Sequence, residues 1–171
     1  MRRMPRLATL QPNGIFIVEV KAMTPEQRAS VIGILGGAQD MTIATVRDDG
    51  YPQATTVSFV HDGITLYFGC DRGSQKARNI DQCDKISLTV NLPYREWRNI
   101  RGLSLGGRAR VVADREEIAR VVELMQTRFP QLHDYLAAPE SADVAVVRIQ
   151  PEVISLLDYR QGFGHTEEVR V

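Results

Sequence analysis

The sequence predicts a mainly β fold with inserted helices, an α+β protein whose six or seven antiparallel strands close into a barrel. Three observations lead to this prediction. Runs rich in β-branched residues alternate with a period of two and are joined mostly by short turns. The helical segments interrupt these runs irregularly, which argues against a doubly wound parallel sheet. Closure into a barrel leaves antiparallel strands of this length with the fewest exposed edges.

Size and composition indicate one globular domain. The chain has 171 residues, of which 43% are hydrophobic and 25% are charged. No apolar run is long enough to span a bilayer, and the N-terminus lacks the apolar segment of a secretory signal. The two cysteines, Cys70 and Cys83, do not form a CxxC pair. We therefore expect a cytoplasmic protein with no membrane partner and no bound metal.

The charge is balanced in total but uneven along the chain. Twenty-one basic and 21 acidic residues give a net charge of zero, which argues against a nucleic-acid partner. Residues 72–110 nevertheless carry nine basic and three acidic residues, a local charge of +6. This segment contains either ordinary solvated arginines or a local anion site.

The first elements follow from capping signals. Residues 1–23 are expected to form an N-terminal arm with one early strand over residues 15–20. A helix begins after Thr24, because Thr24 and Gln27 have the spacing of a capping box. The glycine pair at residues 36–37 is expected to end this helix in a left-handed C-cap.

Three strands follow the helix. Residues 41–47 and 53–60 are rich in β-branched residues and are separated by a tight turn at Asp49-Gly50. A second tight turn, at Asp62-Gly63, leads into a strand over residues 64–70. The three strands are therefore expected to form an antiparallel meander.

A short helix and two further strands come next. The helix runs from Ser74 to about Cys83, and a cleanly alternating strand covers residues 86–92. Residues 101–112 form a long strand that contains three glycines. Glycines inside a strand indicate a bulge or the close approach of another backbone or a flat ligand.

The C-terminal third contains one helix and two strands. The helix begins at Asp114 with a second capping box and ends at Pro130. Residues 143–149 and 153–159 are expected to be separate, paired strands. Residues 24–160 thus form the barrel domain, and residues 161–171 form a polar C-terminal tail.

The common catalytic and nucleotide motifs are missing from the sequence. It contains no GxSxG, HExxH, Walker or GxGxxG pattern. His61, His133 and His165 are each isolated, and Cys70 is interpreted as a small packed residue rather than a reactive thiol. Hydrolase and metalloprotease functions are therefore disfavoured, and no catalytic residue is assigned.

A phosphate site has better support. Ser74, Lys76 and Arg78 stand at the start of a predicted helix, where free backbone N–H groups and the helix dipole favour an anion. The alternative is that Ser74 only caps its own helix while the two basic side chains are solvated. Both interpretations stay open on the residues alone.

The ordered segments resemble a known family. A hairpin MTIATVRDDGYPQATTVSF is followed by ITLYFGC, DRGSQKARNI, an alternating ISLTV strand and the glycine-bearing GLSLGGRARVV. This order resembles the pyridoxamine 5′-phosphate oxidase-like, FMN-binding split β-barrel family over about residues 24–160, most specifically from Tyr67 to Ile80. The resemblance implies a homodimer that binds FMN at the subunit interface, and a small-molecule substrate.

The resemblance also implies cofactor-binding positions. A hairpin strand lies along the flavin ring and sends a side chain toward the phosphate, the end of the next strand lies nearby, and the following loop often reads Ser-Arg-Lys in the family. By position these are Thr55, Thr56 and Val57, then Gly69 and Cys70, then Ser74, Gln75 and Lys76.

Two of these positions depart from the family pattern. Thr55 stands where the oxidases usually carry arginine, and Gln75 replaces another arginine. Neutralisation of the phosphate charge therefore falls to Lys76 and Arg78.

The sequence thus predicts an FMN-dependent oxidoreductase. Its substrate is expected not to be pyridoxamine phosphate, because the tail lacks the family's arginine and histidine pattern for the substrate phosphate. Three alternatives use the same barrel: a non-catalytic flavin-binding or stress-related module, an F420-dependent reductase with Arg95, Arg98 and Arg101 along its groove, and a haem binder with a histidine ligand. Phe163 and His165 in the tail either fray or fold over a flavin edge.

Overall fold

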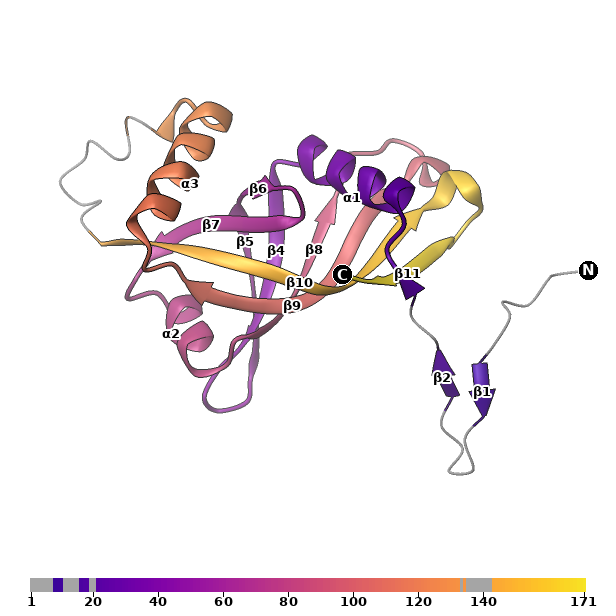
Figure 1. Ribbon diagram of the computed structural model, residues 1–171, viewed down its shortest axis with the longest axis horizontal. Helices are drawn as coiled ribbons and strands as arrows, with labels where there is room; N and C mark the ends of the chain where they lie inside the picture. The colour runs from indigo at the N-terminus through magenta and orange to yellow at the C-terminus, as the bar shows by residue number, and fades with distance from the viewer. Residues whose placement is uncertain (1–7, 11–15, 19–20, 133, 135–142) are drawn as a thin grey trace, which may run out of the picture.

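A single curled sheet with three inserted helices forms the body of the molecule (Figure 1). The computed structural model describes all of residues 1–171 except 1–7, 11–15, 19–20, 133 and 135–142. The sheet has nine strands, and its main path runs in the order β3-β11-β10-β9-β8-β4-β5, with β6 and β7 branching from it. The predicted α+β class and split β-barrel are therefore confirmed.

The elements have the following bounds. The sheet consists of β3 (Lys21–Ala22), β4 (Asp40–Val46), β5 (Pro52–Ser58), β6 (Val60–Asp62), β7 (Thr65–Asp71), β8 (Lys85–Asn91), β9 (Arg101–Val111), β10 (Val144–Asp158) and β11 (Thr166–Arg170). The helices are α1 (Pro25–Gly37), α2 (Gln75–Gln82) and α3 (Arg115–Arg128), with single 3-10 turns η1 (Trp97–Asn99) and η3 (Tyr159–Gln161). A separate two-stranded ribbon pairs β1 (Ala8–Leu10) with β2 (Phe16–Val18), so the early strand predicted over residues 15–20 is present.

Strand β10 organises the barrel because it pairs with three other strands. Its first half pairs with β7, its second half pairs with β11, and β9 pairs with it from Val147 to Asp158. The prediction of two separate strands at 143–149 and 153–159 is therefore wrong. The chain passes Pro151 without ending the strand, because the register shifts between Pro151 and Val153 in a β-bulge opposite Gly106 and Gly107.

The glycine at the bulge permits a very close approach of two backbones. A Cβ built on Gly107 would lie 2.3 Å from the carbonyl oxygen of Gln150. The predicted role of the glycines in β9, a bulge or a close backbone approach, is confirmed here.

The predicted three-strand meander is wrong in its pairing. β5 pairs with β4, whereas β7 pairs with β6 and β10. The chain leaves β5 at Phe59, whose side chain is fully buried, before β6 begins. The two tight turns are as predicted, since Gly50 has φ 82° and Gly63 has φ 58°.

The start of α1 is as predicted, and its end is not. Thr24 Oγ1 accepts from Gln27 N at 3.2 Å while Gln27 Oε1 accepts from Thr24 N at 3.0 Å, which completes the capping box. The helix ends at Ala38 in extended backbone with φ −94°, so the expected left-handed glycine cap is wrong. Instead, Gly37 allows close packing, because a Cβ there would lie 2.9 Å from Leu92 Cδ2.

The hydrophobic core lies inside the curled sheet beneath α1, and a smaller cluster lies under α3. Val31, Ile34 and Leu35 of α1 are buried against residues from the inner faces of β4, β7, β8, β9 and β10. The smaller cluster joins Val121 of α3 to Tyr67 and Val146. Among the described residues, no helix is both long and apolar enough to cross a bilayer.

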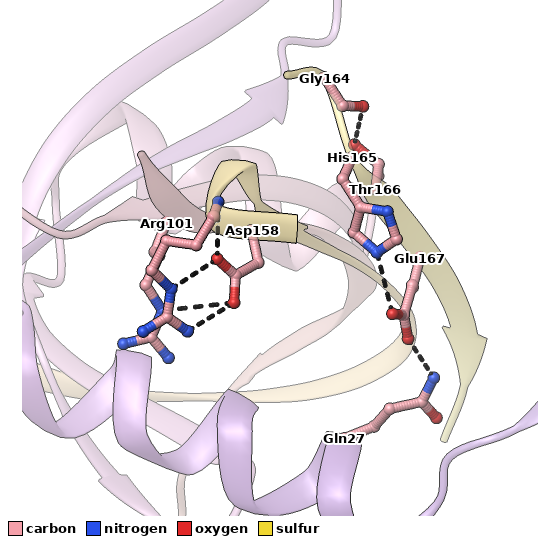
Figure 2. A network of polar contacts seen from close by, with 8 residues as sticks. Gln27, Arg101, Asp158, Gly164, His165, Thr166 and Glu167 are labelled. Carbon is pink, nitrogen blue, oxygen red and sulfur yellow. Dashed lines mark hydrogen bonds and ion pairs between the residues drawn. The ribbon is translucent and has the colours of Figure 1, made fainter. Parts of the chain in front are cut away.

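The C-terminal segment is ordered by polar contacts (Figure 2). Asp158 accepts from Arg160 Nε at 2.8 Å and from Arg160 Nη2 at 2.6 Å, while Arg101 Nε lies 3.9 Å away. Glu167 accepts from Gln27 Nε2 at 2.6 Å and lies 3.0 Å from His165 Nε2. These contacts and the β10–β11 pairing join residues 161–171 to the barrel and to α1, which argues against fraying, one of the two alternatives for the tail.

This network predicts a loss of stability in acid. Hydrogen bonds from Arg160 and from Gln27 are the largest causes that hold the pKa values of Asp158 and Glu167 below their ordinary 3.8 and 4.5. A carboxylate with a lowered folded pKa contributes stability that is fully present above its unfolded pKa and is lost as the pH falls through its folded pKa. The free energy of unfolding is therefore expected to decline as the pH falls below about 4.5.

Urea unfolding at pH 7 and pH 3 measures this decline. Glu167→Gln should reduce the difference between the two pH values, while Glu168→Gln, which changes the exposed neighbouring carboxylate, should leave it unchanged. If the free energy of unfolding falls equally between pH 7 and pH 3 in the two variants, the assignment to Glu167 is contradicted.

Candidate functional site

A mostly apolar cavity of about 450 Å³ lies where β5, β7 and the start of β10 meet α3. Three residues predicted to bind the cofactor line it, namely Val57, Gly69 and Cys70. The remaining described lining residues are Ser58, Asp71, Val122, Met125, Phe129, Gln131, Leu132, Val144 and Val146. The α3 residues were missed by sequence reasoning, because their helical spacing is also that of an ordinary buried helix face.

The register of β5 decides which of its side chains reach the site. Thr55 and Val57 lie opposite Ile43 and Met41, which are buried, so all four share the inner face of the sheet. Thr56 lies on the opposite face, where its Oγ1 is 3.3 Å from Thr42 Oγ1. The structure therefore places Thr55 and Val57 on the inner face, where Val57 lines the cavity and Thr55 does not, and turns the Thr56 side chain to the outer face.

Helix α2 begins directly after the cavity-lining end of β7. Ser74 caps it by accepting from Ala77 N at 3.4 Å. Burial raises the pKa of the Cys70 thiol, while the Ser74 hydroxyl and the Lys76 ammonium act in the opposite direction. Cys70, Ser74 and Lys76 thus lie close together, and the raised pKa keeps Cys70 a protonated, packed thiol. Lys76 forms no hydrogen bond or ion pair with any other described residue.

Gln75 and Arg78 are engaged within the chain. Arg78 donates from Nη1 to the carbonyl oxygen of Gly73 and from Nη2 to Gln75 Oε1 at 2.8 Å. Gln75 Nε2 in turn donates to Asn79 Oδ1 at 2.8 Å. The expected sharing of phosphate charge between Lys76 and Arg78 therefore has geometric support only for Lys76.

Asn79 is a site-supporting residue that sequence reasoning missed. Its side chain is fully buried, and Nδ2 donates to Thr45 Oγ1 at 2.9 Å and to Gln53 Oε1 at 3.1 Å. It therefore joins α2 to β4 and β5, the strand that carries Thr55 two residues after Gln53. The sequence held one signal for this role: the Asn79 amide stands four residues after Gln75, so both lie on the same side of a short helix, and an apolar residue follows Asn79.

His61 and His165 do not line this cavity. His61 Nδ1 is 2.9 Å from the carbonyl oxygen of Gly63, and His165 faces Glu167. His133 lies outside the described residues. Within the described part of the chain, no group of three or more histidine, cysteine, aspartate or glutamate side chains is arranged to hold a metal.

An aromatic pair lies at the opposite end of β10 from the cavity. Phe163 stacks on Trp97 with ring centroids 6.0 Å apart, and the two residues are 76% and 68% exposed. The cavity is lined by the first residues of β10, while Phe163 and His165 follow its last residue. Within one chain, the structure does not bring these two residues to the cavity.

Comparison with known proteins supports the fold. A haem-binding protein of Mycobacterium smegmatis superposes with a TM-score of 0.72 at 16% identity, covering 87% of this chain and 60% of that one. A protein of Listeria innocua named for pyridoxamine 5′-phosphate oxidase has a TM-score of 0.62 at 23% identity, and the match covers 77% of this chain and 98% of that one. A general stress protein of Bacillus anthracis has a TM-score of 0.61 at 20% identity, and the match covers 84% of this chain and 98% of that one.

These structural likenesses establish the fold alone. The chain spans 60% of the Mycobacterium protein's length, and no curated protein matches its sequence. The sequence family provides the stronger result, because the model described as pyridoxamine 5′-phosphate oxidase matches residues 19–158, most of the chain. The chain therefore belongs to the pyridoxamine 5′-phosphate oxidase family.

Proposed function

We propose that this protein is a flavin-dependent oxidoreductase that binds FMN in the cavity between β5, β7 and α3. The observation that carries the proposal is the meeting of an apolar cavity with the unpaired Lys76 at the start of α2. A volume of about 450 Å³ falls within the range of about 300–1,000 Å³ found for small-molecule sites. The apolar lining suits a ring system, and the Lys76 ammonium group suits one compact anionic group on the same ligand.

The residues of this site have separable roles in the proposal. FMN supplies hydride or electron transfer when it is bound. Val57, Met125 and Phe129 provide apolar surface that excludes water from a ring. Lys76, Ser74 and the first N–H groups of α2 supply positive charge and donors for a phosphate. Asn79 fixes the position of α2 relative to β5.

The proposed substrate is a small molecule other than pyridoxamine phosphate. Two basic side chains near the C-terminus already have partners within the chain, since Arg160 pairs with Asp158 and His165 faces Glu167. These carboxylates compete with a substrate phosphate for the two side chains, which agrees with the departure of the tail from the oxidase pattern.

The proposal includes a homodimer with the cofactor at the subunit interface. β5 pairs on one side only, with β4, so the cavity adjoins an open edge of the barrel. Small residues cross the outer face beside this edge, in the row Ala54, Ala44 and Ser87. A second copy that packs there would cover the open edge. Sedimentation equilibrium should give a dimer, and a monomer that retains flavin would contradict the interfacial site.

Lys76→Ala tests the cofactor site. It should weaken FMN binding by about 1.5–3 kcal/mol, at least about tenfold in Kd, since a hydrogen bond to a charged group is lost. The measurement is a titration of the apoprotein that follows flavin fluorescence. Lys85→Ala is the matched control, because Lys85 is an exposed lysine on β8 outside the cavity. Equal affinity in the two variants would exclude Lys76 as the phosphate ligand.

Haem is a second candidate, because two structural neighbours, of Mycobacterium smegmatis and Vibrio cholerae, are named as haem-binding and haem-storage proteins. Neither His61 nor His165, the two histidines among the described residues, lines the cavity, so neither supplies an axial ligand there within one chain. An F420 groove has less support, since Arg98 pairs with Glu96 at 2.6 Å and Arg101 lies 3.9 Å from Asp158. Mass identification of the cofactor released from the purified protein distinguishes FMN from both.

A further inference from the structure

A second cavity, of about 480 Å³, lies on the strands β9 and β10 and shares no lining residue with the first. Its described lining consists of Asp84, Arg108, Ala109, Arg110, Arg148 and Gln150. Three of these six residues are arginines, and one is acidic. We call it the arginine cavity.

The sheet register places the arginines next to one another. Arg148 of β10 lies directly opposite Arg110 of β9, and Gln150 lies opposite Arg108. Lys85 of β8 lies on the other side of Arg108. Like charges directly opposite each other on neighbouring strands destabilise a sheet unless an anion lies between them. The local charge of +6 in residues 72–110 is thus partly concentrated on this face of β8 and β9.

The acidic groups nearby are already engaged by the arginines. Both carboxylate oxygens of Asp84 accept from Arg108 Nη1, at 2.8 and 3.0 Å, and Glu152 accepts from Arg108 Nε at 2.8 Å. Arg148 uses Nη1 to donate to both oxygens of Glu117, at 2.8 and 3.0 Å. The carboxylates therefore bind only some of the guanidinium nitrogens of Arg108 and Arg148, and the remaining nitrogens have no hydrogen-bond partner among the described residues.

Several donors remain unpaired around the cavity. Arg110 forms no hydrogen bond or ion pair with any described residue. Gln150 Oε1 accepts from Thr65 Oγ1 at 3.5 Å, which leaves its NH₂ group free to donate. Among the described residues, the one fully buried side-chain nitrogen or oxygen without a partner is Arg101 Nε. Arg148 Nε and Nη2 have no hydrogen-bond partner among the described residues and are not fully buried, so they face accessible space, and Arg148 lines both this cavity and a neighbouring one beside Glu117.

We propose that the arginine cavity binds the phosphate group of a small phosphorylated molecule, with Arg110 and Arg148 as its principal ligands. A phosphate offers only acceptors at neutral pH, and the planar guanidinium group pairs with it through two parallel hydrogen bonds. The volume of about 480 Å³ exceeds what one phosphate fills and leaves room for the organic part of the ligand. This site uses none of the flavin-binding residues and does not depend on the proposed function.

Calorimetric titration of the full chain with ribose 5-phosphate tests this site. Ribose and inorganic phosphate are titrated in parallel, with ionic strength held constant by sodium chloride. Ribose 5-phosphate should bind saturably and ribose should not. Arg110→Gln should weaken the binding at least about tenfold, through loss of a charge-assisted hydrogen bond. Arg28→Gln is the matched control, because Arg28 is an exposed arginine on α1 with no ion pair among the described residues.

The outcomes separate this site from the flavin site. Lys76→Ala should leave ribose 5-phosphate binding unchanged, whereas Arg110→Gln should leave FMN binding unchanged. Binding of ribose 5-phosphate that is lost in Lys76→Ala but retained in Arg110→Gln would overturn the arginine cavity and leave the flavin proposal intact. Equal weakening by Arg110→Gln and Arg28→Gln, no binding at all, or tighter binding of inorganic phosphate than of ribose 5-phosphate would also overturn it.

Discussion

Gly107→Ala is expected to lower the free energy of unfolding by about 3 kcal/mol, the upper part of the usual range for overpacking. The added methyl carbon would lie 2.3 Å from the carbonyl oxygen of Gln150 and 3.0 Å from Pro151 Cα. Both contacts are with backbone, which cannot move aside as the end of a flexible side chain does. Relief therefore requires the β-bulge in β10 to shift, and with it the pairing to β9.

The neighbouring glycine provides the control for this prediction. A Cβ on Gly106 meets nothing within 4 Å, and its backbone has no positive φ. Gly106→Ala should change stability by less than about 1 kcal/mol and in the stabilising direction, since alanine loses less conformational freedom on folding. Urea unfolding of both variants measures the difference. Similar midpoints for the two would refute the close approach at the bulge.

Glu117→Leu is expected to lower the free energy of unfolding by about 3 kcal/mol, the lower end of the range for breaking a buried ion pair. The Arg148 and Glu117 side chains are only 21% and 12% exposed, so leucine would leave a largely buried guanidinium without its carboxylate. Tyr67 also loses its partner, because its hydroxyl donates to Glu117 Oε1 at 3.0 Å. These contacts hold the first turn of α3 against β7 and β10.

Two further variants identify the ion pair as the cause. Glu116→Leu changes the adjacent, exposed glutamate and should cost less than about 1 kcal/mol, since it weakens only a favourable charge at the helix N-terminus. Tyr67→Phe should cost about 1 kcal/mol, the usual value of one hydrogen bond. Thermal and urea unfolding give both values. A loss in Glu117→Leu no larger than in Glu116→Leu would show that the pair contributes little.

Local signals in the sequence predicted the beginnings of helices and the tight turns. The capping box at Thr24 and the glycine turns at Gly50 and Gly63 depend on residues within a few positions of each other, so they can be recognised without the tertiary fold. Asp114 also caps its helix as predicted. The expected return contact from Glu117 is not formed, because Arg148 and Tyr67 bind that carboxylate instead.

Features that depend on distant residues were not predictable in the same way. Pro151 is a strand breaker by itself, and only the glycines opposite it on β9 show why β10 continues. Segment 166–170 is polar in sequence and becomes a strand because β10 extends past β7 and offers a free edge.

The candidate site divides in the same way, into positions that the sequence predicted and contacts that depend on distant residues. The positions of Val57, Gly69, Cys70 and Lys76 followed from the family pattern, and the structure places them around one cavity or at its end. The engagement of Gln75 and Arg78 within the chain was not predictable, since it depends on the buried amide of Asn79 and a backbone carbonyl.

The position of β10 in the chain also has a consequence for synthesis on the ribosome. β7 and β9 are both made before β10, which is their shared neighbour in the sheet. A nascent chain that has emerged only as far as α3 therefore holds strands with unpaired edges, and the barrel closes after residues 144–158 leave the exit tunnel. Closure late in translation favours slow folding and gives the unfinished chain a period of exposure to aggregation or chaperone binding.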